Sequence, residues 1–317
     1  MQISSVVDIV NGQLLNEPYI SSIVQIHDSV KKIRVGDLFI VKNKNDITTA
    51  IQNGAFAILL DFDVEICDFE IAWIKVEDIV SSQIKLLRFM LSNKNIQTYY
   101  CDTISFELFN IYSSVNKNLI LLSNDIDIDF KKLKNINNTN IILSDNRKYI
   151  KNIQPLHQNF EIDKHSIQNL VQNSLFYVTF LFNNKLYHKI KLTSIYIDHF
   201  LSVENFLGEK LDTNRLKLFN YFAPIFINSN CEIVEFGKSN KFILTNNKAS
   251  LINNEIDFLK DNYGYANIEV IDNIIDDDKL FKLIKTTNFN ALYIKGKHRE
   301  SMMNILQKNT RMANILI

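Results

Sequence analysis

The sequence predicts a multi-domain α/β protein. Its 317 residues correspond to about two domains of roughly 150 residues each, and three smaller domains are also compatible with this length. Apolar residues make up 46% of the chain, which is enough to build hydrophobic cores. Short apolar runs of strand length alternate with segments in which apolar residues recur at helical spacing. This alternation is typical of parallel sheets covered by helices.

Residues 1–97 are expected to form the first α/β domain. Three apolar runs have the length of buried strands: 38–41, 55–60 and 71–76. Asp46 is placed to cap a short helix that stops at Gly54. Between residues 76 and 92, the apolar side chains form one stripe at helical spacing and predict a longer helix.

Residues 98–223 are expected to form a second, shortened α/β domain. Residues 118–144 read as strand, helix and strand, which predicts a parallel βαβ unit with a right-handed crossover. The pair Asn183-Asn184 separates two partly alternating segments and predicts an antiparallel hairpin. A helix over 196–208 follows and ends at Gly208.

Residues 224–317 predict a third domain, a Rossmann-like α/β unit. The expected strands are 225–227, 231–236, 241–244, 267–271 and 291–295. The expected helices are 248–261, 277–286 and one after residue 295. No Pro-rich or Gly-rich linker marks the boundaries near 97 and 224.

Composition excludes several classes of function. The 35 Lys and Arg residues balance 35 Asp and Glu residues, so there is no net attraction toward a nucleic acid backbone or an anionic membrane. No apolar stretch approaches the roughly 18 residues that a membrane span needs. The first residues carry neither the basic segment nor the apolar run of a signal peptide, so a cytoplasmic location is expected.

Glycine is scarce, with seven in the whole chain, and the two closest are Gly36 and Gly54. A phosphate-binding loop needs clustered glycines, because a Cβ would keep backbone N–H groups away from the anion. The tripeptide Gly237-Lys238-Ser239 imitates the end of such a loop, but Glu232 stands where its first glycine belongs. We therefore interpret the tripeptide as a turn and expect no bound cofactor.

Metal ligation is not expected either. Asp125, Asp127 and Asp129 alternate as in a calcium loop, but Phe130 and Ile136 occupy its obligatory glycine and glutamate positions. These aspartates are interpreted as a solvated strand end and helix start. The six histidines and three cysteines show no ligand spacing. The lysines over 131–134 are interpreted as a solvated helix face.

Three segments of the amino-terminal part form a recognisable order: Asp28-Ser29, the run Val35-Gly36-Asp37-Leu38-Phe39-Ile40-Val41, and Ala50-Ile51-Gln52-Asn53-Gly54-Ala55. In this order the amino-terminal part resembles the first domain of the Mur ligases. In that family an Asp-Ser-Arg turn precedes a Gly-Asp-Leu-Phe strand and an Ala-x-x-x-Gly-Ala helix end. The resemblance implies a domain that holds the uridine diphosphate part of a peptidoglycan precursor, UDP-MurNAc-peptide. The family's arginine position is Val30 here.

The carboxy-terminal part is similar to the last strand and helix of the branch of this family that adds D-alanyl-D-alanine. The matching residues are Ala291-Leu292-Tyr293-Ile294-Lys295-Gly296, followed by Met302-Met303 and Leu306. Lys297 replaces the serine of the family's Lys-Gly-Ser turn. Weaker similarity to the family's ATPase domain lies at Asn124-Asp125 and over 175–208.

The resemblance also shows what is missing. Mur ligases form an acyl phosphate from ATP, which requires a phosphate loop between the first and second domains. Here that interval holds about 20 residues, which we expect to be too short for the missing βα units. The main hypothesis is therefore a non-catalytic Mur-ligase-like protein, a pseudoenzyme that binds or regulates in cytoplasmic peptidoglycan precursor synthesis.

Two alternatives stay open. One is an ATP-dependent peptide ligase that adds to UDP-MurNAc-peptide through an unusual nucleotide site. The other is a scaffold that binds a Mur enzyme or a cell-shape protein and takes no small molecule. The candidate substrate-binding residues are Asp28 and Ser29, near a precursor pocket, and Lys295, as an anion contact in the last domain. No catalytic residue is assigned.

Overall fold

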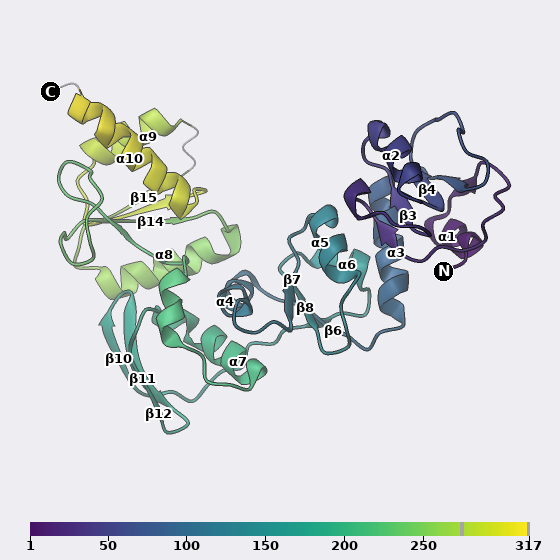
Figure 1. Ribbon diagram of the computed structural model, residues 1–317. Coiled ribbons are helices and arrows are strands. Elements are labelled where there is room, and N and C mark those ends of the chain that lie inside the picture. Colours follow the sequence, from purple (N-terminus) through teal and green to yellow (C-terminus); the bar gives the residue numbers. More distant parts are fainter. Residues whose placement is uncertain (273–275, 316–317) are drawn as a thin grey trace. The chain divides into compact units, whose positions relative to one another are not determined.

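The computed structural model describes residues 1–272 and 276–315, and the chain divides into two units. Unit 1 comprises Met1–Phe106 and Ser113–Phe160, and unit 2 comprises Glu107–Tyr112 and Glu161–Ile317. Each unit contains two sheets (Figure 1). The mixed α/β architecture and the succession of sheets confirm the predicted fold class.

The first sheet of unit 1 has the strand order β1-β5-β4-β3-β2, and all pairs except β1–β5 are parallel. Its strands are β1 (Gln13–Leu14), β2 (Ile26–His27), β3 (Leu38–Ile40), β4 (Ala57–Leu60) and β5 (Ala72–Lys75). The associated helices are α1 (Ile3–Val10), η1 (Val30–Lys32), η2 (Lys44–Asp46), α2 (Ile47–Gln52) and α3 (Ile79–Ser92). The three predicted strands and the long helix are confirmed. The predicted cap is wrong, because the Asp46 side chain makes no capping hydrogen bond to α2.

The second sheet of unit 1 is fully parallel, with the order β7-β8-β6-β9. Its elements are β6 (Gln97–Tyr100), α4 (Thr103–Ser113), β7 (Leu119–Leu121), α5 (Ile126–Leu133), β8 (Ile141–Ser144), α6 (Arg147–Ile153) and β9 (Gln158–Asn159). The βαβ unit predicted over 118–144 is confirmed. The preceding interval, which we expected to be too short for the family's missing βα units, holds one such unit, β6 and α4. The strand is inconspicuous in the sequence because Gln97 and Thr98 interrupt its apolar character.

Helix α3 connects the cores of these two sheets. Its Leu86 and Leu87 belong to one buried cluster with Leu59 of the first sheet and with Phe130 and Ile150 of α5 and α6. Apolar burial therefore continues across residue 97. The division into domains 1–97, 98–223 and 224–317 stays a prediction.

The antiparallel sheet of unit 2 has the order β10-β11-β12. Its strands are β10 (Gln168–Ser174), β11 (Tyr177–Phe182) and β12 (Lys185–Ile190), followed by η3 (Ser194–Tyr196), α7 (Ile197–Leu207) and η4 (Thr213–Leu218). The hairpin at Asn183-Asn184 is confirmed, and both residues have positive φ, at 49° and 59°, as a tight hairpin turn requires. Gly208 ends α7 in the left-handed conformation, as predicted.

The last sheet of unit 2 has the order β13-β14-β16-β15, with β13 antiparallel to its neighbour. Its elements are β13 (Ile225–Phe226), β14 (Phe242–Asn246), α8 (Ala249–Tyr263), β15 (Ile268–Ile271), α9 (Asp277–Thr286), β16 (Ala291–Lys295) and α10 (Arg299–Ile315). The strand predicted over 231–236 is wrong, because Ile233 forms an isolated bridge to Ile227. Gly237 lies in a turn, as predicted, with φ of 79°.

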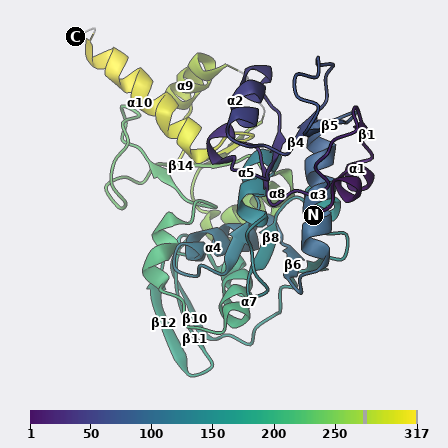
Figure 2. The ribbon, with the colours of Figure 1, turned by 45° about the vertical axis from the view of Figure 1, so that its right-hand side comes forward.

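The helices of this sheet lie on opposite faces. Apolar side chains of α9 and α10 share one buried cluster with Ile243, Leu292 and Ile294. Tyr293 alternates to the other face and donates a hydrogen bond to Glu255 of α8. Figures 1 and 2 show α9 and α10 together on the side of β14 away from α8. Adjacent strands β14 and β16 therefore lead into helices on different faces, which opens a crevice between their carboxyl ends.

Candidate functional site

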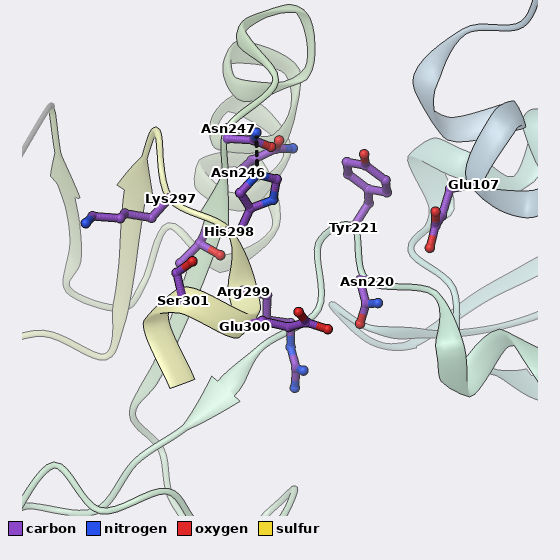
Figure 3. Close-up of a pocket in the computed structure, with 11 residues that line it drawn as sticks. Glu107, Asn220, Tyr221, Asn246, Asn247, Lys297, His298, Arg299, Glu300 and Ser301 are labelled. Carbon is purple, nitrogen blue, oxygen red and sulfur yellow. Dashed lines mark hydrogen bonds between the residues drawn. The ribbon is translucent and has the colours of Figure 1, made fainter. Parts of the chain in front are cut away.

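A cavity of about 480 Å3 lies at this crevice in unit 2. Its lining residues are polar or charged: Glu107, Asn220, Tyr221, Thr245, Asn246, Asn247, Lys297, His298, Arg299, Glu300 and Ser301. In open α/β sheets, ligands bind outside the carboxyl ends of strands at the point where the topology reverses. The cavity has this position, and Figure 3 shows the side chains that surround it.

The parallel pairing of β14 with β16 places the two sides of the cavity opposite each other. Asn246 is in register with Lys295, so the segments that follow them begin at the same level. The backbone N–H of Gly296 donates to the carbonyl oxygen of Asn246 over 2.8 Å. One step further, the Asn247 side-chain amide and His298 Nε2 lie 2.9 Å apart (Figure 3). These bonds hold the loop before α8 against the loop before α10.

A buried hydrogen-bond network joins η3 and β16 to α8 beside the cavity. Glu255 of α8 is fully buried and accepts hydrogen bonds from the hydroxyls of Tyr196, at 2.5 Å, and Tyr293. Burial raises the pKa of Glu255, and the hydrogen bonds from the two tyrosines only partly oppose this rise. The same network raises the pKa of both hydroxyls, chiefly through burial. The sheet under the cavity is therefore fixed by a fully enclosed polar cluster.

One of the charges around the cavity is already paired. Lys297 Nζ lies 2.6 Å from Asp277 Oδ1, and its side chain points away from Asn246 and His298 in Figure 3. Burial raises the pKa of Glu107. Among the described residues, no group of three His, Cys, Asp or Glu side chains could hold a metal ion. The site offers amide, imidazole and hydroxyl groups, which suit hydrogen bonding to a polar ligand.

Lys295, the predicted anion contact, lies just outside this lining. It ends β16, and its Nζ is 2.6 Å from Asp272 Oδ1. The charge is thus already paired with a carboxylate. Its role stays a prediction, whereas the neighbouring Lys297 and His298 do line the cavity and were not singled out by their sequence.

Asp28 and Ser29 belong to unit 1, directly after β2. The Asp28 carboxylate lies 2.7 Å from Lys42 Nζ and 3.2 Å from Lys131 Nζ, with its side chain 2% exposed. Burial alone would raise the pKa of Asp28, but the hydrogen bonds and charges of the two lysines outweigh it and lower that pKa. Ser29 precedes η1 and makes no capping hydrogen bond with its side chain.

A cavity of about 370 Å3 lies beside this pair. Its lining residues are Val24, Gln25, His27, Lys31, Lys32, Arg34, Val35 and Asp37. Desolvation and the charge of Lys134, at 2.7 Å, lower the pKa of His27 although Asp37 opposes them. The exposed Lys31, Lys32 and Arg34 outnumber the one carboxylate, so the cavity favours an anionic ligand.

The lysines over 131–134 make tertiary contacts, whereas a solvated helix face was predicted. Lys131 pairs with Asp28, and Lys134 Nζ contacts His27 and donates to the Ile26 carbonyl oxygen at 3.1 Å.

The aspartates before these lysines also differ from expectation. Asp125 lies at a helix start, as predicted, and caps α5, but Asp129 is fully buried and accepts hydrogen bonds from Ser123 and Tyr149. Their spacing in the sequence gives no sign of these tertiary partners.

The junction of β6 and α4 in unit 1 is a second strand-to-helix edge. Only Cys101 and Asp102 separate the strand from the helix. Asp102 Oδ1 accepts hydrogen bonds from the backbone N–H groups of Ile104, at 2.9 Å, and Ser105, at 3.1 Å. The carboxylate thus satisfies the first turn of α4 and opposes the positive end of its dipole. A phosphate placed there would meet a negative charge.

The edge around this junction is also filled by side chains. The Arg147 guanidinium lies over the Tyr100 ring at 4.1 Å. Asn124 Nδ2 is 3.4 Å from Asp145 Oδ1, between the ends of β7 and β8. Cys101 is fully buried, and desolvation raises the pKa of its thiol. Side chains that follow β6, β7 and β8 thus line the carboxyl edge of this sheet and pair with one another.

Solved structures show which fold this is. The MurF ligase from Thermotoga maritima, solved in complex with ADP, aligns with a TM-score of 0.52 at 13% identity, over 91% of this chain and 98% of that chain. The chain has the Mur-ligase fold. MurF from Acinetobacter baumannii aligns with a TM-score of 0.51 at 9% identity, over 98% of both chains. No protein-family model and no curated protein sequence matches the chain.

The residues of the β6–α4 junction do not fit a nucleotide triphosphate in the way that phosphate loops hold one. Such a loop places a glycine-rich run between a strand and a helix, so that backbone N–H groups surround the phosphates. In this Mur-ligase fold the strand and the helix are present, but the connection is short, contains no glycine and carries Asp102 at the helix start. The strand and the helix of this βα unit are thus joined without a glycine-rich loop.

Proposed function

We propose that the chain is a non-catalytic Mur-ligase-like protein that acts as a binding or regulatory partner in cytoplasmic peptidoglycan precursor synthesis. The Mur-ligase fold supports the family relation. The observation that carries the non-catalytic part is the β6–α4 junction. There Asp102 takes the two backbone donors that a transferred phosphate would need.

The ligand we propose is a uridine diphosphate-linked muramyl peptide, bound by unit 1. Such a precursor is an anion, and the cavity beside Asp28 and Ser29 carries Lys31, Lys32 and Arg34. Asp28 itself is held by Lys42 and Lys131, so its part is to fix the turn that presents these cations. Ser29, with a hydroxyl free of capping bonds, is the proposed direct contact.

In unit 2 the proposed ligand contact is weaker. Lys295 must exchange its ion pair with Asp272 for a ligand anion, so we assign it a secondary role.

None of the helices in the described part of the chain combines the length and apolar character needed to span a bilayer. A Mur enzyme or a cell-shape protein is the proposed recipient of the regulation.

Calorimetric titration of the purified chain with the muramyl pentapeptide nucleotide tests the binding part. We expect saturable binding that weakens roughly tenfold in the double variant Lys32→Met/Arg34→Met, because charged hydrogen bonds to phosphate are lost. The matched control is Lys117→Met/Lys148→Met, which removes the same charge from exposed positions of unit 1. Equal binding by both double variants would contradict the proposed pocket.

Release of inorganic phosphate tests the non-catalytic part. With ATP, magnesium, precursor and D-alanyl-D-alanine present, we expect no release above the rate without the chain. Precursor-dependent release would instead support the alternative of an ATP-dependent ligase. A flat titration with the precursor, together with stoichiometric capture of one Mur enzyme or cell-shape protein, would support the scaffold alternative.

A further inference from the structure

A separate cavity of about 330 Å3 lies in unit 2 between the antiparallel sheet and the segment around β13. Most of its wall is apolar or aromatic: Phe176, Tyr177, Ala223, Pro224, Ile225, Phe226, Ile233, Val234 and Phe236. The remaining lining residues are Lys191, Lys217 and Arg299. Its lining therefore contains three cationic side chains and no carboxylate.

Two of the three cations, Lys191 and Arg299, are held by neutral groups. Lys191 Nζ donates to the backbone carbonyl oxygen of Lys217 over 2.9 Å, and an Arg299 Nη donates to that of Pro224 over 3.4 Å. Within residues 1–272 and 276–315, none of the three lies within 4.0 Å of a carboxylate oxygen. Arg299 Nε is also buried without a hydrogen-bond partner. The cavity thus has positive charge and donor capacity that the protein does not satisfy.

Burial makes the positive charges of Lys191 and Arg299 unfavourable when no anion lies between them. Lys191 and Arg299 are half-buried. Burial and the positive charge of Arg299 both lower the pKa of Lys191. Burial also lowers the pKa of Arg299, and the charge of Glu300 only partly opposes this. An anion between these side chains would remove the repulsion and satisfy the donors.

Arg299 is directed toward this cavity rather than toward the carboxyl edge of the sheet. Figure 3 shows its side chain pointing away from Asn246 and His298. It is the one residue that contributes to the lining of both cavities. The guanidinium presents a planar fork that matches a carboxylate or a phosphate.

From this arrangement we propose that the cavity binds an amphipathic anion. Its carboxylate or phosphate contacts Lys191, Lys217 and Arg299. Its aromatic or branched apolar body packs against Phe176, Phe226 and Phe236. Concave sites with apolar walls and a few convergent polar groups are typical of small-molecule binding. This site is independent of the proposed precursor pocket in unit 1 and adds a ligand to the proposed function.

Calorimetric titration of the full chain with simple probes tests the proposal. The probes are 2-naphthyl phosphate and 2-naphthoate, which pair the two anions with one apolar body. Inorganic phosphate and 2-naphthol supply the anion and the body separately. We expect at least one of the naphthyl anions to bind at one site per chain, at least tenfold more tightly than either separate part. The stronger of the two identifies the anion as phosphate or carboxylate.

Charge-removing variants locate the binding. Lys191→Met and Lys217→Met keep the apolar stems, and each should weaken the bound naphthyl anion roughly tenfold, as loss of one charged hydrogen bond predicts. Lys189→Met is the matched control, because Lys189 is exposed in β12, two residues before Lys191, and lines neither cavity. Thermal unfolding of each variant checks that it is folded. The proposal fails if no naphthyl anion binds saturably, if 2-naphthol binds as tightly, or if Lys191→Met binds like Lys189→Met.

Discussion

The sheet β7-β8-β6-β9 of unit 1 and the sheet β13-β14-β16-β15 of unit 2 differ at their carboxyl edges. In unit 1, the edge of β7-β8-β6-β9 is occupied by Asp102, Arg147 and the pair Asn124–Asp145. In unit 2, the edge between β14 and β16 leaves a cavity of about 480 Å3. Both edges have strand-to-helix connections of the kind that ligand-binding α/β proteins use. Similar topologies thus carry one edge lined by paired side chains and one edge with a cavity.

The difference comes from the connections and not from the strands. Between β6 and α4 the chain turns through Cys101 and Asp102, and the carboxylate folds back onto the helix. After β16, Gly296 has φ of 79° and two further residues precede α10, so the chain leaves the sheet before the helix starts. The connection after β6 is thus short and acidic, whereas the one after β16 is one residue longer and contains a glycine.

The largest expected effect concerns the support of the open edge. Glu255→Ala should lower the free energy of unfolding by roughly 3 kcal/mol, because it removes two buried hydrogen bonds and leaves two tyrosine hydroxyls unsatisfied. Urea denaturation measures the change, and Glu209→Ala, at an exposed position, is the control. A loss below about 1 kcal/mol, the size of one ordinary hydrogen bond, would show that the network does not hold this edge.

The same residue predicts a pH dependence. The pKa of Glu255 is raised in the folded protein, so folding favours its protonated form. This contribution is present below the ordinary glutamate pKa of about 4.3 and is lost as the pH rises through the folded value. Unfolding free energies measured from pH 4 upward should therefore fall in the wild type relative to Glu255→Gln. Parallel curves for the two proteins would contradict the raised pKa.

A smaller effect is expected at the β6–α4 edge. Asp102→Ala removes the cap of α4 and should destabilise the protein by about 1 kcal/mol. Asp102→Asn should restore most of this stability, because asparagine caps helices as well as aspartate does. Thermal or urea denaturation of the three proteins decides the point. If Ala and Asn variants are equally destabilised, the carboxylate acts through its charge and not through the cap.

The smallest effect on stability is expected at the rim of the open edge. Asn247→Ala removes the contact to His298, which is exposed, and should change the unfolding free energy by less than about 0.5 kcal/mol. Hydrogen exchange of the amides at the starts of α8 and α10 should nevertheless become faster, because the two loops are no longer joined. Unchanged exchange would mean that the backbone bond from Gly296 to Asn246 suffices.

The sequence predicts the strands of the sheets better than it predicts what lies at their carboxyl edges. Apolar runs identify β3, β4, β14 and β16, because buried strands are continuously apolar. The polar residues of β6 make this strand hard to recognise in the sequence. The strand matters because it lies in the interval where a phosphate loop would be expected. The open cavity joins Asn246 and Asn247 to residues 297–301, and only the parallel register brings these segments together.

Buried charges are the other class of feature that the sequence conceals. Asp129 and Glu255 lie in helices among polar neighbours, so local pattern assigns them to solvent. Their partners, Tyr149 for the first and Tyr196 and Tyr293 for the second, come from other elements. A charge can be assigned to the core only when its tertiary hydrogen bonds are known.

The most direct test of the central claim is a calorimetric titration of the purified chain with magnesium ATP. If Asp102 stands in place of a phosphate loop at the β6–α4 edge, the titration will show no saturable heat up to millimolar nucleotide. Excess nucleotide will also fail to add the roughly 2.7 kcal/mol of stability that a ligand supplies at 100 times its dissociation constant. Saturable binding that Asp102→Asn strengthens would place the triphosphate at this edge and contradict the account.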